Sequence, residues 1–177
     1  MRLTHWLAGL ARKQPLSRRF TRRKWHGDLR PAVERLEDRT LLAAAFGDQA
    51  IISSGADGAS SVFAVDVDGD GDMDVLSASH DDDTVAWYEN DGSQNFTERV
   101  ISTVADQAFD VFAADVDGDG DIDVLSASGL DDKIAWYEND GSQNFTELVV
   151  SASAANAASV FAVDVDGDGD IDVLSAS

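Results

Sequence analysis

The sequence of 177 residues contains no cysteine, two prolines and three histidines. Without cysteine the chain can form no disulfide, no thiolate metal site and no cysteine nucleophile, and cysteine usage does not assign a redox compartment. No stretch of about 18 apolar residues is present, so no transmembrane helix is predicted. If the protein is exported, bound ions rather than disulfides would have to stabilise its fold.

Positive charge is almost confined to the first 40 residues. Residues 1–40 contain 11 Lys and Arg and 4 Asp and Glu, a formal charge of +7, whereas residues 41–177 contain 2 and 30, a formal charge of −28. A surface this acidic repels nucleic acid and anionic membranes, so neither is an expected partner, and it attracts cations. The acidic part is also rich in aliphatic and aromatic residues, so we expect it to bury a core.

The basic segment, residues 1–46, ends in the short apolar run Leu41–Phe46, which contains three consecutive alanines. A basic region followed by an apolar run and small residues is typical of an export signal, although standard signals have roughly 7–15 apolar residues. We predict an export or targeting arm that is disordered or forms one short helix from Pro31. The stretch LEDRTLLA, which includes Glu37, resembles the Leu-Glu-x-Arg-x-Leu-Leu motif of large exported bacterial proteins, and this implies a secreted or cell-surface location.

A 49-residue repeat organises the rest of the chain. Residues 61–109 and 110–158 are identical at 35 of 49 positions, and residues 159–177 correspond to the first part of the same repeat. Residues 47–60 correspond to the end of a repeat. The predicted organisation is therefore an N-terminal arm, the tail of an incomplete repeat, two full repeats and a truncated third repeat.

Each full repeat is predicted to contain four short β-strands. In the first repeat the strands are residues 61–66, 73–79, 84–89 and 96–102, and residues 90–95 form a turn around Asp91-Gly92. No segment after residue 46 keeps a helical apolar period. Four antiparallel strands that recur about every 40–50 residues are typical of a β-propeller blade. The predicted fold class is all-β, a partial β-propeller of four-stranded antiparallel blades.

Two aromatic pairs, Trp87-Tyr88 and Trp136-Tyr137, recur at the same place in the two full repeats. They could form a platform on which a ligand stacks. Packing between neighbouring blades explains them more simply, because large aromatic side chains dominate core energetics. We therefore predict that they belong to the core.

Three aspartate-rich nonapeptides share the pattern Asp-x-Asp-Gly-Asp-Gly-Asp-x-Asp. Two carboxylates about 4 Å apart repel by roughly 1 kcal/mol in water and roughly 4 kcal/mol at an effective dielectric constant of 20. The glycines permit positive φ, so the segment can curl and bring its carboxylates together. A divalent cation removes the repulsion, and ligand sets made only of oxygen favour Ca²⁺ or Mg²⁺ over zinc or copper. Five protein ligands on a flexible loop suit calcium better, because magnesium keeps several waters.

Other interpretations of the nonapeptides are an EF-hand, an RTX β-roll and a solvated acidic turn. An EF-hand needs Glu at position 12 and flanking helices, but position 12 is Ser77, Ser126 or Ser175 and the flanks are predicted strands. An RTX β-roll needs tandem nonapeptides, and these occur singly. A solvated turn does not explain three copies at a fixed spacing. We therefore predict up to three bound Ca²⁺ ions.

The sequence DVDGDGDxDVL…AWYENDGSQNFT resembles the FG-GAP/VCBS repeat family, the blades of integrin-α-type propellers, over roughly residues 47–177. The signature words FG and GAP do not occur within the repeats, residues 61–177, which favours the VCBS-like bacterial branch. The resemblance implies Ca²⁺ held in a hairpin by the side chains at positions 1, 3, 5 and 9 and the backbone carbonyl at position 7. The implied ligands are Asp66, Asp68, Asp70, Asp72 (carbonyl) and Asp74; Asp115, Asp117, Asp119, Asp121 (carbonyl) and Asp123; and Asp164, Asp166, Asp168, Asp170 (carbonyl) and Asp172.

No catalytic site is predicted. Two histidines lie in the basic arm, and the third, His80, corresponds to Gly129 in the second repeat. Ser79, His80 and Asp82 are near neighbours in the sequence, an arrangement that rarely forms a catalytic triad. The dense groups of carboxylates are all accounted for by calcium, so paired acids for glycoside hydrolysis are not inferred.

The predicted function is that of a calcium-binding extracellular repeat protein, a structural or interaction module of adhesion-like type. The family resemblance implies that loops at one end of the blades bind a protein or carbohydrate. The alternative is a truncated or accessory propeller segment of a larger exported enzyme. Two and a half repeats cannot close a propeller, which typically has four or more blades, so we expect either a truncated gene product or self-association into a closed ring.

Overall fold

The computed structural model describes residues 49–177. The predicted basic arm, with its export motif and its helix from Pro31, lies outside the described residues, and the predicted domain boundaries stay predictions. Residues 49–177 contain no helix of the length and apolarity needed to cross a membrane.

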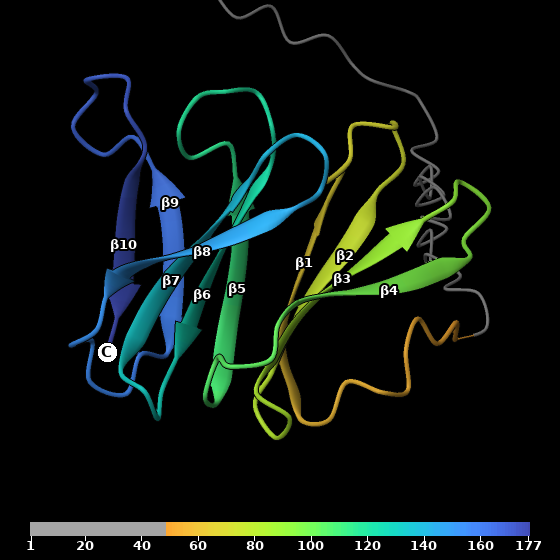
Figure 1. Ribbon diagram of the computed structural model, residues 1–177, viewed down its shortest axis with the longest axis horizontal. Coiled ribbons are helices and arrows are strands. Elements are labelled where there is room, and N and C mark those ends of the chain that lie inside the picture. Colours follow the sequence, from red (N-terminus) through yellow and green to blue (C-terminus); the bar gives the residue numbers. More distant parts are fainter. Residues whose placement is uncertain (1–48) are drawn as a thin grey trace, which may run out of the picture. The chain divides into compact units, whose positions relative to one another are not determined.

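Ten β-strands form three antiparallel sheets (Figure 1). Blade 1 contains β1 (Ala59–Val65), β2 (Asp74–Ser79), β3 (Thr84–Asn90) and β4 (Phe96–Ser102). Blade 2 contains β5 (Ala108–Ala114), β6 (Asp123–Ser128), β7 (Lys133–Asn139) and β8 (Phe145–Ser151). Half-blade 3 contains β9 (Ser159–Val163) and β10 (Asp172–Ala176). Strands that are neighbours in the sequence pair within each sheet, which confirms the predicted fold class.

The strand that differs most from its predicted bounds is β1, which begins at Ala59 rather than Ser61. Ala59 pairs with Ser79 across a register shift between Ala59 and Ser61. The Ser60 hydroxyl lies at this irregularity and donates a hydrogen bond to the Ala108 carbonyl of blade 2 at 2.8 Å. The small residues before Ser61 have the composition of a turn, so this extension of the strand could not be predicted from them.

Blades 1 and 2 pack face to face around a continuous core. We call the face that a blade turns toward the following blade its back face, and the opposite face its front face. Strand β6 is buried along its whole length, as expected for a strand that is apolar on both sides. The residues of this interface are Leu76, Ala78, Val85 and Trp87 on the back of blade 1 and Val111, Ala113, Val124, Ala135 and Tyr137 on the front of blade 2.

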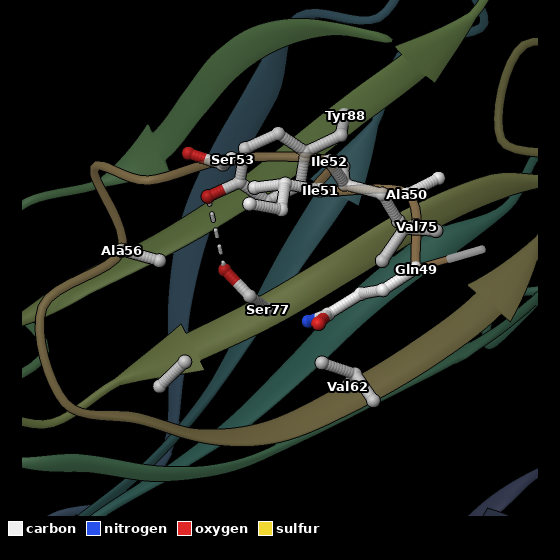
Figure 2. Close-up of a pocket in the computed structure, with 11 residues that line it drawn as sticks. Gln49, Ala50, Ile51, Ile52, Ser53, Ala56, Val62, Val75, Ser77 and Tyr88 are labelled. Atoms are coloured by element: carbon white, nitrogen blue, oxygen red, sulfur yellow. Dashed lines mark hydrogen bonds between the residues drawn. The ribbon is translucent and has the colours of Figure 1, made fainter. Parts of the chain in front are cut away.

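The same arrangement recurs between blade 2 and half-blade 3. The buried residues here are Leu125, Ala127 and Ile134 on the back of blade 2 and Val160 and Ala162 on the front of half-blade 3. Trp136 packs against this second cluster, and Trp87 and both tyrosines are almost fully buried. The prediction that the aromatic pairs belong to the core between blades holds for Trp87, Trp136 and Tyr137, whereas Tyr88 lies on the front face of blade 1, beside the segment that precedes it (Figure 2).

A single carboxylate connects all three sheets at the first strand of each. Asp110 Oδ1 accepts a hydrogen bond from the Ser61 hydroxyl at 2.7 Å, and Asp110 Oδ2 accepts one from the Ser159 hydroxyl at 2.8 Å. The Val160 N–H also donates to Oδ2, at 3.0 Å. The three residues occupy the same position of successive repeats, so this bridge helps to hold the sheets at a regular spacing.

Candidate metal centre

The three aspartate nonapeptides occupy equivalent loops between the first and second strands of each sheet. Figure 1 shows these loops, between β1 and β2, β5 and β6, and β9 and β10, at the same end of the three sheets. Each loop is short and is held at both ends by an antiparallel strand pair. The fold therefore repeats one candidate site three times, in the positions that the sequence repeat predicts.

The first aspartate of each nonapeptide closes its loop. Asp66 Oδ1 accepts a hydrogen bond from the Gly69 N–H at 2.9 Å, and Asp66 Oδ2 accepts one from the Gly71 N–H at 3.0 Å. The two glycines have φ values of 75° and 97°, a backbone region that residues with a Cβ rarely adopt. The curl that these glycines permit is thus the physical reason that a run of aspartates forms a loop rather than a strand.

The next two aspartates turn their carboxylates toward the same point. Asp68 Oδ1 accepts the Asp70 N–H at 3.2 Å, and Asp70 Oδ1 accepts the Asp72 N–H at 2.9 Å. As a result three carboxylates of each loop have oxygens within 4.8 Å of one another. The three groups are Asp66, Asp68 and Asp70; Asp115, Asp117 and Asp119; and Asp164, Asp166 and Asp172.

The electrostatic environment of the first loop disfavours its negative charge. Burial raises the pKa of Asp68, and the neighbouring carboxylates of Asp70 and Asp74 raise it further, whereas the hydrogen bond from the Asp70 N–H acts in the opposite direction. A divalent cation among these groups would replace the repulsion with attraction. The carboxylates are therefore arranged unfavourably unless they hold a cation.

The last aspartate of the nonapeptide is buried in the two complete blades. Asp74 accepts hydrogen bonds from the Val67 and Asn90 N–H groups at 3.0 and 2.7 Å, and Asp123 accepts them from Val116 and Asn139 at 3.1 and 2.8 Å. Burial raises the pKa of Asp123, and its two backbone hydrogen bonds only partly offset this. Neither residue joins the carboxylate group of its loop.

In half-blade 3 the last aspartate of the nonapeptide has a different environment. Asp172 is exposed and accepts one backbone hydrogen bond, from the Val165 N–H at 3.0 Å. Its carboxylate joins those of Asp164 and Asp166, while Asp168 does not. In each loop, therefore, three of the four carboxylates that were implied as ligands lie together. The fourth does not belong to that group.

The seventh residue of the nonapeptide turns its side chain away from these carboxylates. A Cβ placed on Gly92 would lie 2.4 Å from Asp72 Oδ2, and one on Gly141 would lie 2.4 Å from Asp121 Oδ2. The carboxylates of Asp72 and Asp121 therefore lie against the turn that follows the third strand. This orientation fits a role for the backbone carbonyl, rather than the side chain, at position 7.

Two asparagines that the sequence analysis did not single out connect this turn to the loop. The Asn90 side chain accepts the N–H groups of Gly92 and Gln94 and donates to the Met73 carbonyl at 3.0 Å. Asn139 makes the equivalent bonds in blade 2 and is buried. The identical NDGSQN segment of both repeats was the available signal, but its sequence indicates only a turn.

The donor set fits a hard divalent cation. All side-chain donors in the loops are carboxylate oxygens, which Ca²⁺ and Mg²⁺ prefer. Within residues 49–177, the two basic side chains pair elsewhere: Arg99 contacts Glu89, and Lys133 contacts Asp131 and Glu147. No lysine or arginine of this part of the chain therefore neutralises the aspartate loops.

The neighbours of His80 do not assemble into a triad in the described residues. His80 Nδ1 lies 3.0 Å from Asp81 Oδ1, and the Ser79 hydroxyl is buried without a hydrogen-bond partner. The imidazole packs edge-on against Phe109, with ring centroids 5.9 Å apart. His80 thus contacts Asp81 and Phe109 and does not form a nucleophile–base pair with Ser79.

Comparison with known proteins gives a family for these repeats. A family model described as an FG-GAP-like repeat matches the chain twice, at residues 66–126 and 115–175. Each match begins at one aspartate loop and runs past the next, and together they span more than half of the sequence. No curated protein matches the chain. With its repeated loops, its antiparallel blades and these two matches, the chain belongs to the FG-GAP-like repeat family.

Proposed function

We propose that this protein is an extracellular or cell-surface interaction module whose propeller blades are stabilised by calcium, one Ca²⁺ in each aspartate loop. The proposal rests on one observation: in each of three equivalent loops, three carboxylates have oxygen atoms within 4.8 Å of one another. Repulsion between these groups destabilises the folded loops, and a bound cation reverses its sign. Family membership supports the same assignment.

The proposed ligand set extends the three carboxylates that lie together in each loop. It comprises the side chains at positions 1, 3, 5 and 9 and the carbonyl at position 7 of each nonapeptide. The outward turn of the Asp72 and Asp121 side chains supports the carbonyl assignment. Several protein oxygens on one loop favour Ca²⁺ over Mg²⁺, because Mg²⁺ retains most of its waters.

Calcium would act on stability through the strand pairs that each loop joins. A ligand that binds only the folded state stabilises it by about 2.7 kcal/mol per site when its free concentration is a hundredfold above Kd. Each loop joins two strands that contribute to a core between blades. Occupation of the loops should therefore raise the stability of the whole blade array.

The test is thermal unfolding of the full chain, followed by circular dichroism, with CaCl₂, MgCl₂ or EGTA. We expect a large rise in melting temperature with calcium, a smaller one with magnesium, and neither in EGTA. The matched control is the triple variant Asp68→Asn, Asp117→Asn and Asp166→Asn. Asparagine keeps the oxygen that accepts the backbone N–H but removes one charge from each group.

The control separates calcium binding from a general effect of charge. The triple variant should lose the response to calcium, yet in EGTA it should be at least as stable as the original chain, because repulsion in the loops is reduced. A melting temperature of the original chain that ignores EGTA, or a variant that keeps the full calcium response, would contradict the proposal.

The interaction role is supported by the three acidic loops, which lie at the same end of the blades (Figure 1) and are largely or partly exposed. Such a surface favours a partner that is basic or that completes the coordination of a bound cation. Pull-down of surface proteins and glycan-array binding, each with calcium and with EGTA, test this role. Export is tested by locating the full chain and a Glu37→Ala, Arg39→Ala variant in a bacterial host.

A further inference from the structure

The aspartate loops also contain apolar residues, at positions 2 and 8 of the nonapeptide, and these side chains enter the cores between the blades. Val67, at position 2 of the first loop, is 3% exposed and belongs to the core between blades 1 and 2. Ile122, at position 8 of the second loop, packs against the same core. Each of these two neighbouring loops thus contributes one side chain to the core that lies between their blades.

The same arrangement recurs at the next interface. Val116, at position 2 of the second loop, and Ile171, at position 8 of the third, pack against the core between blade 2 and half-blade 3. The second loop therefore takes part in both cores, through Val116 on one side and Ile122 on the other. Because the same two positions are used at both interfaces, this contact is a property of the repeat rather than of one loop.

The last aspartate of each loop connects these apolar residues to the other carboxylates. In the second loop, Asp123 directly follows Ile122 in the chain, and its Oδ2 accepts a hydrogen bond from the Val116 N–H at 3.1 Å. In the first loop, Asp74 Oδ2 accepts a hydrogen bond from the Val67 N–H at 3.0 Å. A change in the position of the last carboxylate is therefore passed to the residues that the loop contributes to the cores.

Two effects of opposite sign can couple neighbouring loops. A cation bound in one loop reduces the negative charge there, which weakens the attraction for the next cation, although such effects are screened beyond about 8 Å at physiological ionic strength. A cation that orders one loop also orders the side chain that this loop contributes to the shared core. The neighbouring loop then packs against an ordered partner, so it loses less conformational entropy when it binds. Charge therefore gives negative cooperativity, and the shared core gives positive cooperativity.

We propose that neighbouring aspartate loops bind their cations with positive cooperativity, which is transmitted by the apolar residues at positions 2 and 8 through the core between the blades. For the loops of blades 1 and 2 the transmitting residues are Val67 and Ile122. The coupling is reciprocal, so a cation in either loop raises the affinity of the other by the same factor. This inference rests on the proposed binding of one cation by each loop.

Isothermal titration calorimetry with CaCl₂ measures the coupling in chains that keep two loops or one. The full chain with Asp166→Asn retains the loops of blades 1 and 2, and a further Asp68→Asn or Asp117→Asn leaves a single loop. Allosteric couplings usually start at about fivefold, and one shared core implies a factor of about that size. After correction for the number of free sites, the second ion should therefore bind the two-loop chain about fivefold more tightly than the single-loop chains bind theirs. Equal or weaker binding of the second ion would overturn the proposal.

A matched pair of valine substitutions in the two-loop chain tests the route of the coupling. Val67 and Val85 are both buried in the core between blades 1 and 2, but Val85 pairs with Ala78, near the end of β2 that lies away from the loop. Val67→Ala keeps the backbone N–H that Asp74 accepts and should abolish the cooperativity. Val85→Ala should also lower the melting temperature but should keep the cooperativity. An equal loss of cooperativity in both variants would overturn the role of the loop residue.

Ile122→Ala approaches the same route from the other blade. Ile122 is only partly buried, so this variant should remain folded even if Val67→Ala does not, and circular dichroism checks this. Ile122→Ala should abolish the cooperativity as Val67→Ala does, and the double variant should behave like either single variant, because both residues act through one core. Cooperativity that survives in the double variant would overturn the proposal.

The single-loop chains keep this proposal separate from that for calcium binding. If they bind calcium while the two-loop chain shows two independent sites, the coupling is refuted and calcium binding stands. If no chain binds calcium and no melting temperature differs between CaCl₂ and EGTA, calcium binding is refuted and the coupling with it. Tighter binding of the second ion that depends on Val67 and Ile122 supports both proposals.

Discussion

Two segments with the same nine residues, Asp115–Asp123 and Asp164–Asp172, form loops that differ at their last position. In blade 2, Asp123 is buried and accepts two backbone hydrogen bonds. In half-blade 3, Asp172 is exposed, accepts one, and joins the carboxylate group of its loop. The first five positions, by contrast, make the same hydrogen bonds in both loops.

The difference arises from a third strand. The second N–H donor to Asp123 is that of Asn139, at the end of β7 and 16 positions along the chain. Among residues 49–177, half-blade 3 is built from β9 and β10, and no strand takes the place of β7 beside them. The local sequence thus builds the curl of the loop, while a neighbouring strand decides whether the last carboxylate is buried and accepts two backbone hydrogen bonds or lies exposed beside the other carboxylates of its loop.

The largest expected effect comes from removing the buried carboxylate of Asp123. Asp123→Ala should lower the free energy of unfolding by about 3 kcal/mol, because it leaves the buried N–H of Asn139 and the partly buried N–H of Val116 without an acceptor, whereas Asp172→Ala should cost about 1 kcal/mol or less. Urea unfolding in EGTA measures both without a contribution from calcium. Asp74→Ala is the matched variant in blade 1 and should resemble Asp123→Ala. Equal costs for Asp123 and Asp172 would show that the third strand does not matter.

The second largest effect is expected from Asn139, whose backbone N–H donates a hydrogen bond to Asp123. Asn139→Ala removes two accepted bonds, from the Gly141 and Gln143 N–H groups, and one donated to the Ile122 carbonyl. We expect a loss of about 2 kcal/mol in the free energy of unfolding. Ser142→Ala, which changes an exposed side chain of the same turn, should be nearly neutral. An Asn139→Ala variant as stable as Ser142→Ala would contradict the anchoring role.

Calcium affinity should divide the loops into two classes. The loops of blades 1 and 2 are braced by their turns, whereas the third loop must order more of itself on binding. Isothermal titration calorimetry should therefore show two sites and a third that is about tenfold weaker, a difference of about 1.4 kcal/mol. Asp166→Asn should remove the weaker class and Asp117→Asn one of the stronger sites. The reverse assignment would refute this order.

The smallest expected effect is a decrease in the free energy of unfolding at acidic pH, which arises in the two complete blades. Hydrogen bonds from the Asn95 and Asn144 side chains hold the pKa values of Asp91 and Asp140 below the ordinary value. Because the folded pKa values lie below the unfolded ones, this stability is present above the unfolded pKa, about 4, and is lost as the pH falls through the folded values.

Urea unfolding from neutral pH down to acid pH measures this dependence. The Asp91→Asn, Asp140→Asn double variant should be less sensitive to acid over that range than the original chain. Carbon-13 NMR titration of the two carboxyl groups should give values below those of model peptides. Unshifted pKa values would contradict the proposed role of the asparagine side chains.

Much of the fold could be predicted from the sequence because its information is local or periodic. The four strands of a blade, the turn at Asp91-Gly92 and the packing of Trp87 follow from β-branched and aromatic content, turn residues and the 49-residue spacing. The three carboxylate groups also follow, since the glycines that curl each loop lie inside it. The bridge from Asp110 to Ser61 and Ser159 could not be predicted, because it joins residues 49 positions apart across separate sheets.

The repeating unit can be predicted from the sequence alone: a four-stranded blade with an acidic, glycine-curled loop between its first two strands, repeated at a constant phase. Which copies of identical residues differ in environment depends on how the sheets pack. Val62 and Val160 have the same neighbouring residues, as do Asp123 and Asp172, yet one of each pair is exposed and the other buried. The physical reason is that burial and hydrogen bonding at these positions depend on a neighbouring strand or sheet, which no local pattern encodes.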